Sequence, residues 1–146
     1  MLLSMGANIF CIKTSLWILA AIALKIISWE DNPLRRGKDA PDLFLIMRTY
    51  LDAGNRDRFF DENADLIGDE GFDYTLAGSR LLGRDIATIL SSKTRKVIVD
   101  ILDRETKDQD QFTIVENMIG RGTESSTFEE ALRLLEEMKT GILERV

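Results

Sequence analysis

The sequence predicts a mainly α fold, a compact bundle of about six helices, and three observations support this class. Apolar residues recur at spacings of three and four along most of the 146-residue chain. No stretch after Pro41 alternates apolar and polar residues as a half-buried strand does. Both prolines fall within the first 41 residues, so nothing interrupts helices in the remainder. A chain of this length suits one domain with a single hydrophobic core.

The first element expected is an apolar helix that follows a poorly specified lead-in. Residues 1–14 form this lead-in: Met1–Ile12 have no helical period, and Ile9–Ile12 leave both a short N-terminal strand and an irregular segment open. Ser15 can cap a helix that runs through Ser28 and is apolar nearly all round, so we expect it at the centre of the bundle. Residues 15–146 should form one all-helical domain. The buried stripe of this first helix comprises Leu16, Leu19, Ile22 or Ala23, Ile26 and Ile27.

A charged turn over residues 30–37 should separate this helix from the next, because Asp-Asn-Pro favours turns. Asp39 is a suitable N-cap for the second helix, and Asp42 follows three residues later, where acidic groups favour the positive helix end. This helix should run to about Leu51. The segment Ala53–Asn55 then supplies the glycine that a left-handed helix cap prefers.

The sequence from Arg56 onward predicts further helices joined by loops. Arg56–Ala64 is at most a short charged helix, and Gly68–Phe72 is a loop because it has little to bury. Ser91-Ser92 should end one long helix and cap the next. Ser126 and Glu129 form a capping box for the last helix. The apolar stripes of these helices include Leu76, Leu81 or Leu82, Ile86 and Ile89; Val97, Ile98, Ile101 and Leu102; Phe112, Val115, Met118 and Ile119; Phe128, Leu132, Leu135 and Met138.

Composition excludes several classes of function. The net charge of −6 argues against a broad nucleic-acid surface, which would need a basic face. The sequence has no histidine, which removes the commonest general base and excludes ordinary zinc chemistry. Cys11 is the only cysteine, so no internal disulfide can form and we expect a cytoplasmic protein. Without a histidine to activate it, Cys11 has a core or incidental role.

The apolar N-terminal region predicts a buried helix and no membrane span. Thr14–Leu24 is an uncharged run of 11 residues between Lys13 and Lys25, whereas a spanning helix needs about 20. A signal peptide would carry basic residues before the apolar run, and residues 1–12 carry none. Alanines 21 and 23 imitate a cleavage site, so a secreted or N-terminally anchored helical protein stays an open alternative.

No complete catalytic constellation stands in the sequence. Polymerase-type nucleotidyl transfer needs a Gly-Ser turn and then two carboxylates one residue apart on a strand. Gly78-Ser79 is followed by Asp85, but residue 87 is alanine and the whole stretch has a helical period. Asp108-Gln109-Asp110 has the carboxylate spacing without a preceding Gly-Ser turn. Gly120-Arg121-Gly122 lacks the lysine and the spacing of a phosphate loop.

A basic cluster beside the second helix is the best candidate for a binding site. Arg35, Arg36 and Lys38 precede a helix N-terminus, where backbone N–H groups and positive side chains favour anions. The alternative is that these residues form a solvated turn without a ligand, and that Asp39 serves as the cap of the next helix.

The same segment resembles a known family. Leu24–Trp29 followed by Arg35–Leu43 resembles the part of bacterial nucleotidyltransferases of the AbiEii abortive-infection toxin type that follows their catalytic sheet. In that family a helix carrying a lysine leads through a basic turn into a helix that begins Arg/Lys-Asp-x-x-Asp-Leu. The matching residues are Lys25, Lys38, Asp39 and Asp42. Tyr50–Asn55, Phe72–Tyr74 and Ala77–Ile86 also resemble the helical C-terminal region of such proteins.

The resemblance implies a nucleotide-binding role for Lys25, Arg36, Lys38, Asp39 and Asp42. The lysines would neutralise triphosphate charge, and the aspartates would orient them or bind hydroxyl groups. The family's sheet, with its metal-binding aspartates, would have to precede Leu16, where only 15 residues stand. The chain therefore resembles a C-terminal half with no catalytic or metal-binding residues, and the resemblance implies that it should not catalyse alone. Magnesium and a nucleoside triphosphate would be needed once a separate catalytic half completed it.

Several origins and one alternative function stay open. The chain could be a natural truncation, an alternative-start or frameshift product, or a half that acts with another polypeptide. The alternative function is a helical protein-interaction or homodimerisation module without enzymatic activity. Without a sheet to cover them, apolar residues of the first helix at Leu16, Leu19 and Ile22 would be exposed and would favour association.

Overall fold

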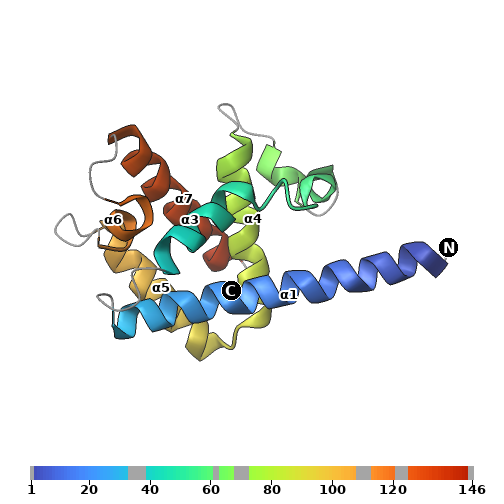
Figure 1. Ribbon diagram of the computed structural model, residues 1–146, viewed down its shortest axis with the longest axis horizontal. Coiled ribbons are helices and arrows are strands. Elements are labelled where there is room, and N and C mark those ends of the chain that lie inside the picture. Colours follow the sequence, from blue (N-terminus) through green and yellow to red (C-terminus); the bar gives the residue numbers. More distant parts are fainter. Residues whose placement is uncertain are drawn as a thin grey trace.

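A computed structural model of the chain describes residues 2–32, 39–60, 63–67, 73–107, 113–120 and 125–144. It confirms the predicted mainly α fold, because these residues form six α-helices and two short 3-10 helices and no strand (Figure 1). The α-helices are α1 (Leu2–Asp31), α3 (Asp39–Thr49), α4 (Tyr74–Ile89), α5 (Ser92–Lys107), α6 (Thr113–Ile119) and α7 (Ser125–Glu144). The 3-10 helices are η1 (Arg56–Phe60), which lies within the predicted short charged helix Arg56–Ala64, and η2 (Ala64–Ile67), which was not predicted.

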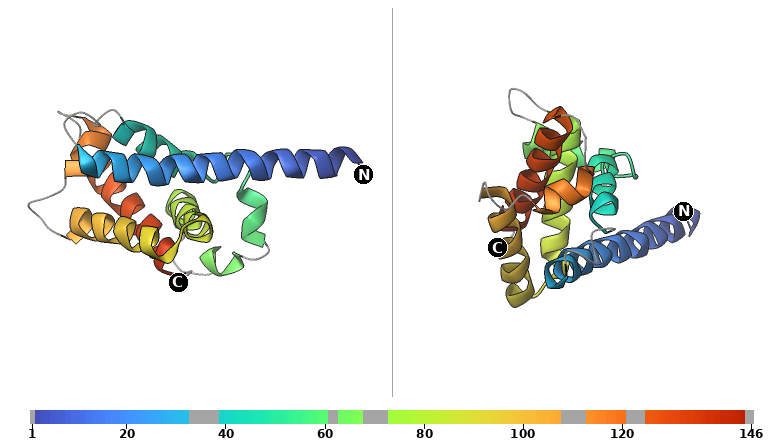
Figure 2. Two further views of the ribbon diagram at one scale, coloured as in Figure 1. Left: turned by 90° about the horizontal axis from the view of Figure 1, so that it is seen from below. Right: turned by 60° about the vertical axis from the view of Figure 1, so that its left-hand side comes forward.

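Helix α4, rather than the first helix, lies at the centre of the bundle. It packs against α1, α3 and α7, and Leu81, Leu82 and Ile86 on it are fully buried (Figures 1 and 2). The prediction that the apolar first helix would be central is wrong, since Trp17 and Leu24 on α1 are exposed. A helix that is apolar all round can still lie at the edge of a bundle when its neighbours cover only one face.

The packing of α4 on α7 depends on two glycines that let the backbones approach. A Cβ at Gly83 would lie 2.0 Å from the carbonyl oxygen of Met138, and a Cβ at Gly141 would lie 2.0 Å from that of Arg80. The Ser79 hydroxyl donates a hydrogen bond to the α7 carbonyl oxygen of Leu134, at 2.7 Å. Each helix therefore places a glycine against the backbone of the other.

The C-terminal half of helix α1 packs on the bundle. Leu19, Ile22, Ile26 and Trp29 are buried against neighbours that include α3, α4 and α5. The same helix continues in the N-terminal direction until its end extends past the other elements (Figure 1 and the left view of Figure 2). Residues 2–14, for which a strand or an irregular segment was open, are thus helical, because an established helix adds each further turn at little cost.

The helix ends agree with the sequence signals at several points. Gly54 has a positive φ of 93°, as the predicted left-handed cap requires. The Ser91 hydroxyl accepts a hydrogen bond from the Thr94 N–H at 3.2 Å, which confirms its role as a cap. Asp39, predicted as an N-cap, is instead the first residue of α3, and α7 begins at Ser125, one residue before its predicted cap. Of the turn expected over residues 30–37, Glu30 and Asp31 are instead the last residues of α1. Residues 33–37 of that turn and the expected loop 68–72 lie outside the described residues.

In the part of the chain that the structure describes, none of the helices combines the length and the apolar character that a membrane span requires.

Candidate functional site

The packing of α1 against α3 brings three of the predicted site residues together. Nζ of Lys25 lies 3.2 Å from Oδ1 of Asp39 and 3.4 Å from Oδ2 of Asp42. The two aspartates are three residues apart in the first turn of α3, so their side chains share one face of that helix. The side chains of Lys25 and Asp39 are about three-quarters buried, while Asp42 is mostly exposed.

The electrostatics of this cluster keep the lysine charged. Burial lowers the pKa of Lys25, but hydrogen bonds and attraction to Asp39 and Asp42 outweigh it, so that the pKa is raised overall. Asp39 and Asp42 therefore hold a protonated ammonium group in a fixed place between two helices. With one cation and two carboxylates, the three side chains carry one excess negative charge.

Two further predicted site residues, Arg36 and Lys38, lie outside the described residues. The anion-binding corner that the basic turn predicts therefore stays a prediction. The structure does show that its flanks meet, because Lys25 from before the turn contacts Asp39 and Asp42 from after it.

A second polar network joins the segment after α3 to the middle of α4. Arg58 binds Asp85 with two hydrogen bonds, from Nη1 to Oδ2 at 2.6 Å and from Nη2 to Oδ1 at 2.7 Å. The Tyr50 hydroxyl donates to the same carboxylate, and Arg58 also donates to Oδ1 of Asn55 at 3.1 Å. Asn55 is buried and donates back to the Tyr50 carbonyl oxygen at 2.7 Å.

This network leaves no free base or nucleophile. Burial, followed by the nearby Asp85 carboxylate, raises the pKa of Tyr50, and its hydrogen bonds to Asp85 raise the pKa of Arg58. Tyr50 therefore remains a neutral hydrogen-bond donor and Arg58 remains a cation over the physiological range. Both lone-pair-bearing oxygens of Asp85 are occupied, so the carboxylate that follows Gly78-Ser79 in the sequence has a structural role.

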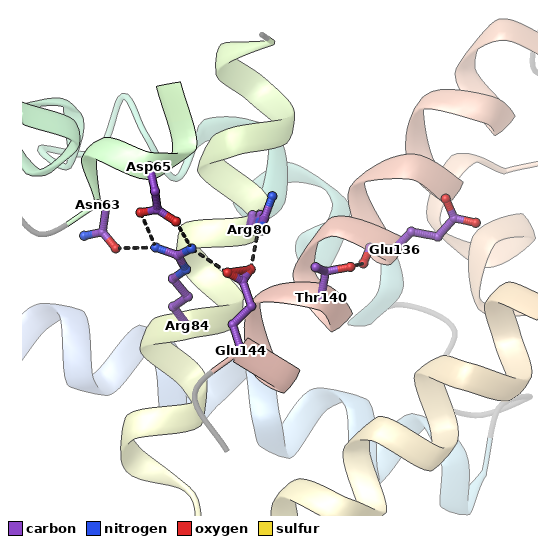
Figure 3. Close-up of polar contacts among 7 residues, drawn as sticks. All are labelled: Asn63, Asp65, Arg80, Arg84, Glu136, Thr140 and Glu144. Atoms are coloured by element: carbon purple, nitrogen blue, oxygen red, sulfur yellow. Dashed lines mark hydrogen bonds and ion pairs between the residues drawn. The ribbon is translucent and has the colours of Figure 1, made fainter. Parts of the chain in front are cut away.

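A third network, centred on Arg84, ties three elements together (Figure 3). Its guanidinium binds Asp65 from η2 at 3.0 and 2.6 Å and Glu144 from the end of α7. It also donates to Oδ1 of Asn63 at 3.1 Å, and Arg80 one turn earlier binds the same Glu144. The Arg84 side chain is only 6% exposed, so a buried cation is matched by carboxylates from two separate segments. Sequence reasoning missed this network, although two arginines one turn apart in an apolar helix are a usable signal.

The remaining motifs that were tested for chemistry have structural explanations or lie outside the described residues. Gly78 packs against Leu51, whose Cβ would lie 3.1 Å from an added Cβ, and Ser79 is fully buried against α7. Gly120 ends α6 with a φ of 75°. Asp108–Asp110 falls outside the description. Among the described residues no group of three or more His, Cys, Asp or Glu side chains could hold a metal ion.

Acid titration should act on stability in two opposite directions. Hydrogen bonds from Arg84 lower the pKa of Asp65, and those from Arg80 and Arg84 lower the pKa of Glu144 against the effect of burial. Their stabilisation is complete above their ordinary values of 3.8 and 4.5 and is lost as the pH falls through the lowered values. Burial raises the pKa of Glu105 and Glu137, so protonating these two relieves an unfavourable charge first.

We therefore expect the free energy of unfolding to hold or rise slightly as the pH is lowered from 7 towards 5. Below about 4.5 it should fall steeply, because the carboxylates around Arg84 are then protonated in the unfolded chain and lose their advantage in the folded one. Urea unfolding followed by circular dichroism at a series of pH values measures this profile. A steady decline that begins at pH 7, or stability unchanged down to pH 3, would contradict it.

No protein-family model, curated protein or solved structure matches this chain. A proposal about its function therefore depends on the cluster of Lys25, Asp39 and Asp42 and on the sequence motif that carries these residues.

Proposed function

We propose that this chain is the C-terminal helical part of a nucleotidyltransferase-family protein of the AbiEii type, a family associated with toxin–antitoxin systems. It would form the nucleotide side of an active site whose metal-binding residues come from a separate catalytic half. The completed enzyme would transfer a nucleotide from a nucleoside triphosphate to an RNA, protein or small-molecule acceptor. A cytoplasmic location suits such a reaction and a chain with a single cysteine.

One observation carries the proposal. The lysine and the two aspartates that the family resemblance singles out are separated by 14 and 17 positions in the sequence, yet their side chains form one cluster. Asp39 and Asp42 fix the position and the charge of Lys25, so the ammonium group is already oriented when a phosphate arrives. About a quarter of the Lys25 side chain is exposed, which leaves it accessible to a ligand.

The charge of the cluster indicates the form of ligand that it would accept. One lysine between two carboxylates does not attract a free polyanion, because the three groups together are negative. A triphosphate whose charge is largely neutralised by magnesium on the catalytic half suits it better. Lys25 would then contact one phosphate oxygen while the aspartates keep the lysine in place.

The test is substitution of Lys25 by methionine, which keeps the unbranched shape and most of the length of the side chain and removes its charge. We expect at least a tenfold loss in the rate of labelled nucleotide incorporation when the chain is combined with a catalytic half, because losing one positioned group that stabilises transition-state charge typically costs about a hundredfold or more. The matched control is Lys96→Met, which removes an exposed helical lysine paired with Asp100. An upstream reading frame with a Gly-Ser turn and an Asp-x-Asp strand would encode the half to use.

Two outcomes would count against the proposal. Equal rates for Lys25→Met, Lys96→Met and the unaltered chain would show that the cluster only joins α1 to α3. Labelling of RNA or of the chain itself by the purified chain with magnesium and nucleoside triphosphates would show that it is not an incomplete half. Unfolding free energies of both variants separate loss of function from loss of folding.

A helical interaction module without enzymatic activity is the second candidate, and the surface of α1 favours it. Trp17 is 79% exposed and Leu24 is 64% exposed. The prediction that Leu16, Leu19 and Ile22 would all be exposed is wrong for two of them. Leu19 and Ile22 are buried in the bundle, and only Leu16 is exposed. Such a module would act by binding a partner or a second copy without turnover.

A further inference from the structure

We draw no further inference here: the strongest candidate, the exposed apolar patch of Trp17, Ala20 and Leu24 on the outer face of α1, carries nothing because nothing in the structure shows what covers it.

Discussion

Gly83→Ala is expected to lower the free energy of unfolding by about 3 to 5 kcal/mol. The added methyl group would lie 2.0 Å from the Met138 carbonyl oxygen and 3.0 Å from the Ile142 nitrogen, and both are backbone atoms of α7 that cannot turn aside. The two helices would have to separate and would lose contacts along their whole length. Urea unfolding followed by circular dichroism measures the change.

The expected sign of the change in stability distinguishes a glycine packed against backbone from one on an open helix surface. On an open helix surface, replacing glycine with alanine stabilises a helix by about 1 kcal/mol. Thr88→Ala on the exposed face of the same helix is the control, and it should change stability by no more than about 0.5 kcal/mol. A Gly83→Ala protein as stable as the unaltered chain would mean that α4 and α7 are further apart than described.

Arg84→Met is expected to lower the free energy of unfolding by about 2 to 4 kcal/mol, because the carboxylates that the guanidinium binds lose their hydrogen-bond donor. Glu144 keeps only Arg80 as a partner, and Asp65 loses two hydrogen bonds. The cost stays below that of a fully buried pair, since Asp65 is more than half exposed and water can solvate it. Thermal and urea unfolding of the variant give the value.

Arg56→Met is the matched control for this substitution. Arg56 pairs with Asp52 one turn away at 2.7 Å, but both side chains are more than 60% exposed. Its loss should cost about 0.5 kcal/mol or less. Similar losses for the two arginines would show that the Arg84 network is as weakly coupled to folding as a surface pair.

The helices could be predicted because their signals are local. The apolar spacing over Tyr74–Ile89 and the hydroxyl of Ser91 act within one or two turns, so a single sequence contains what is needed to recognise them. Gly54 is similar, because a left-handed cap depends on one residue.

The arrangement of the helices could not be predicted in the same way. The apolar pattern of α1 does not say which face its neighbours cover, so Trp17 and Leu24 could not be separated from Ile22. From the sequence alone, Gly83 would only be expected to destabilise its helix. The structure shows that the backbone of α7 packs directly against it. The cluster of Lys25 with Asp39 followed from the family resemblance, whereas the Arg84 network joins segments that nothing in the local sequence connects.

The crossing of α4 and α7 also bears on how the chain folds during its synthesis. Ser79 and Leu134, which are hydrogen-bonded in the folded protein, are 55 residues apart in sequence. While a ribosome is still making the residues between them, α7 has not been synthesised and cannot pack against the glycine-bearing face of α4. The largest packing surface of the bundle therefore stays exposed. The emerging chain therefore exposes Leu81 and Leu82 until α7 has been released, and over that interval it should be a substrate for chaperones that bind apolar helices.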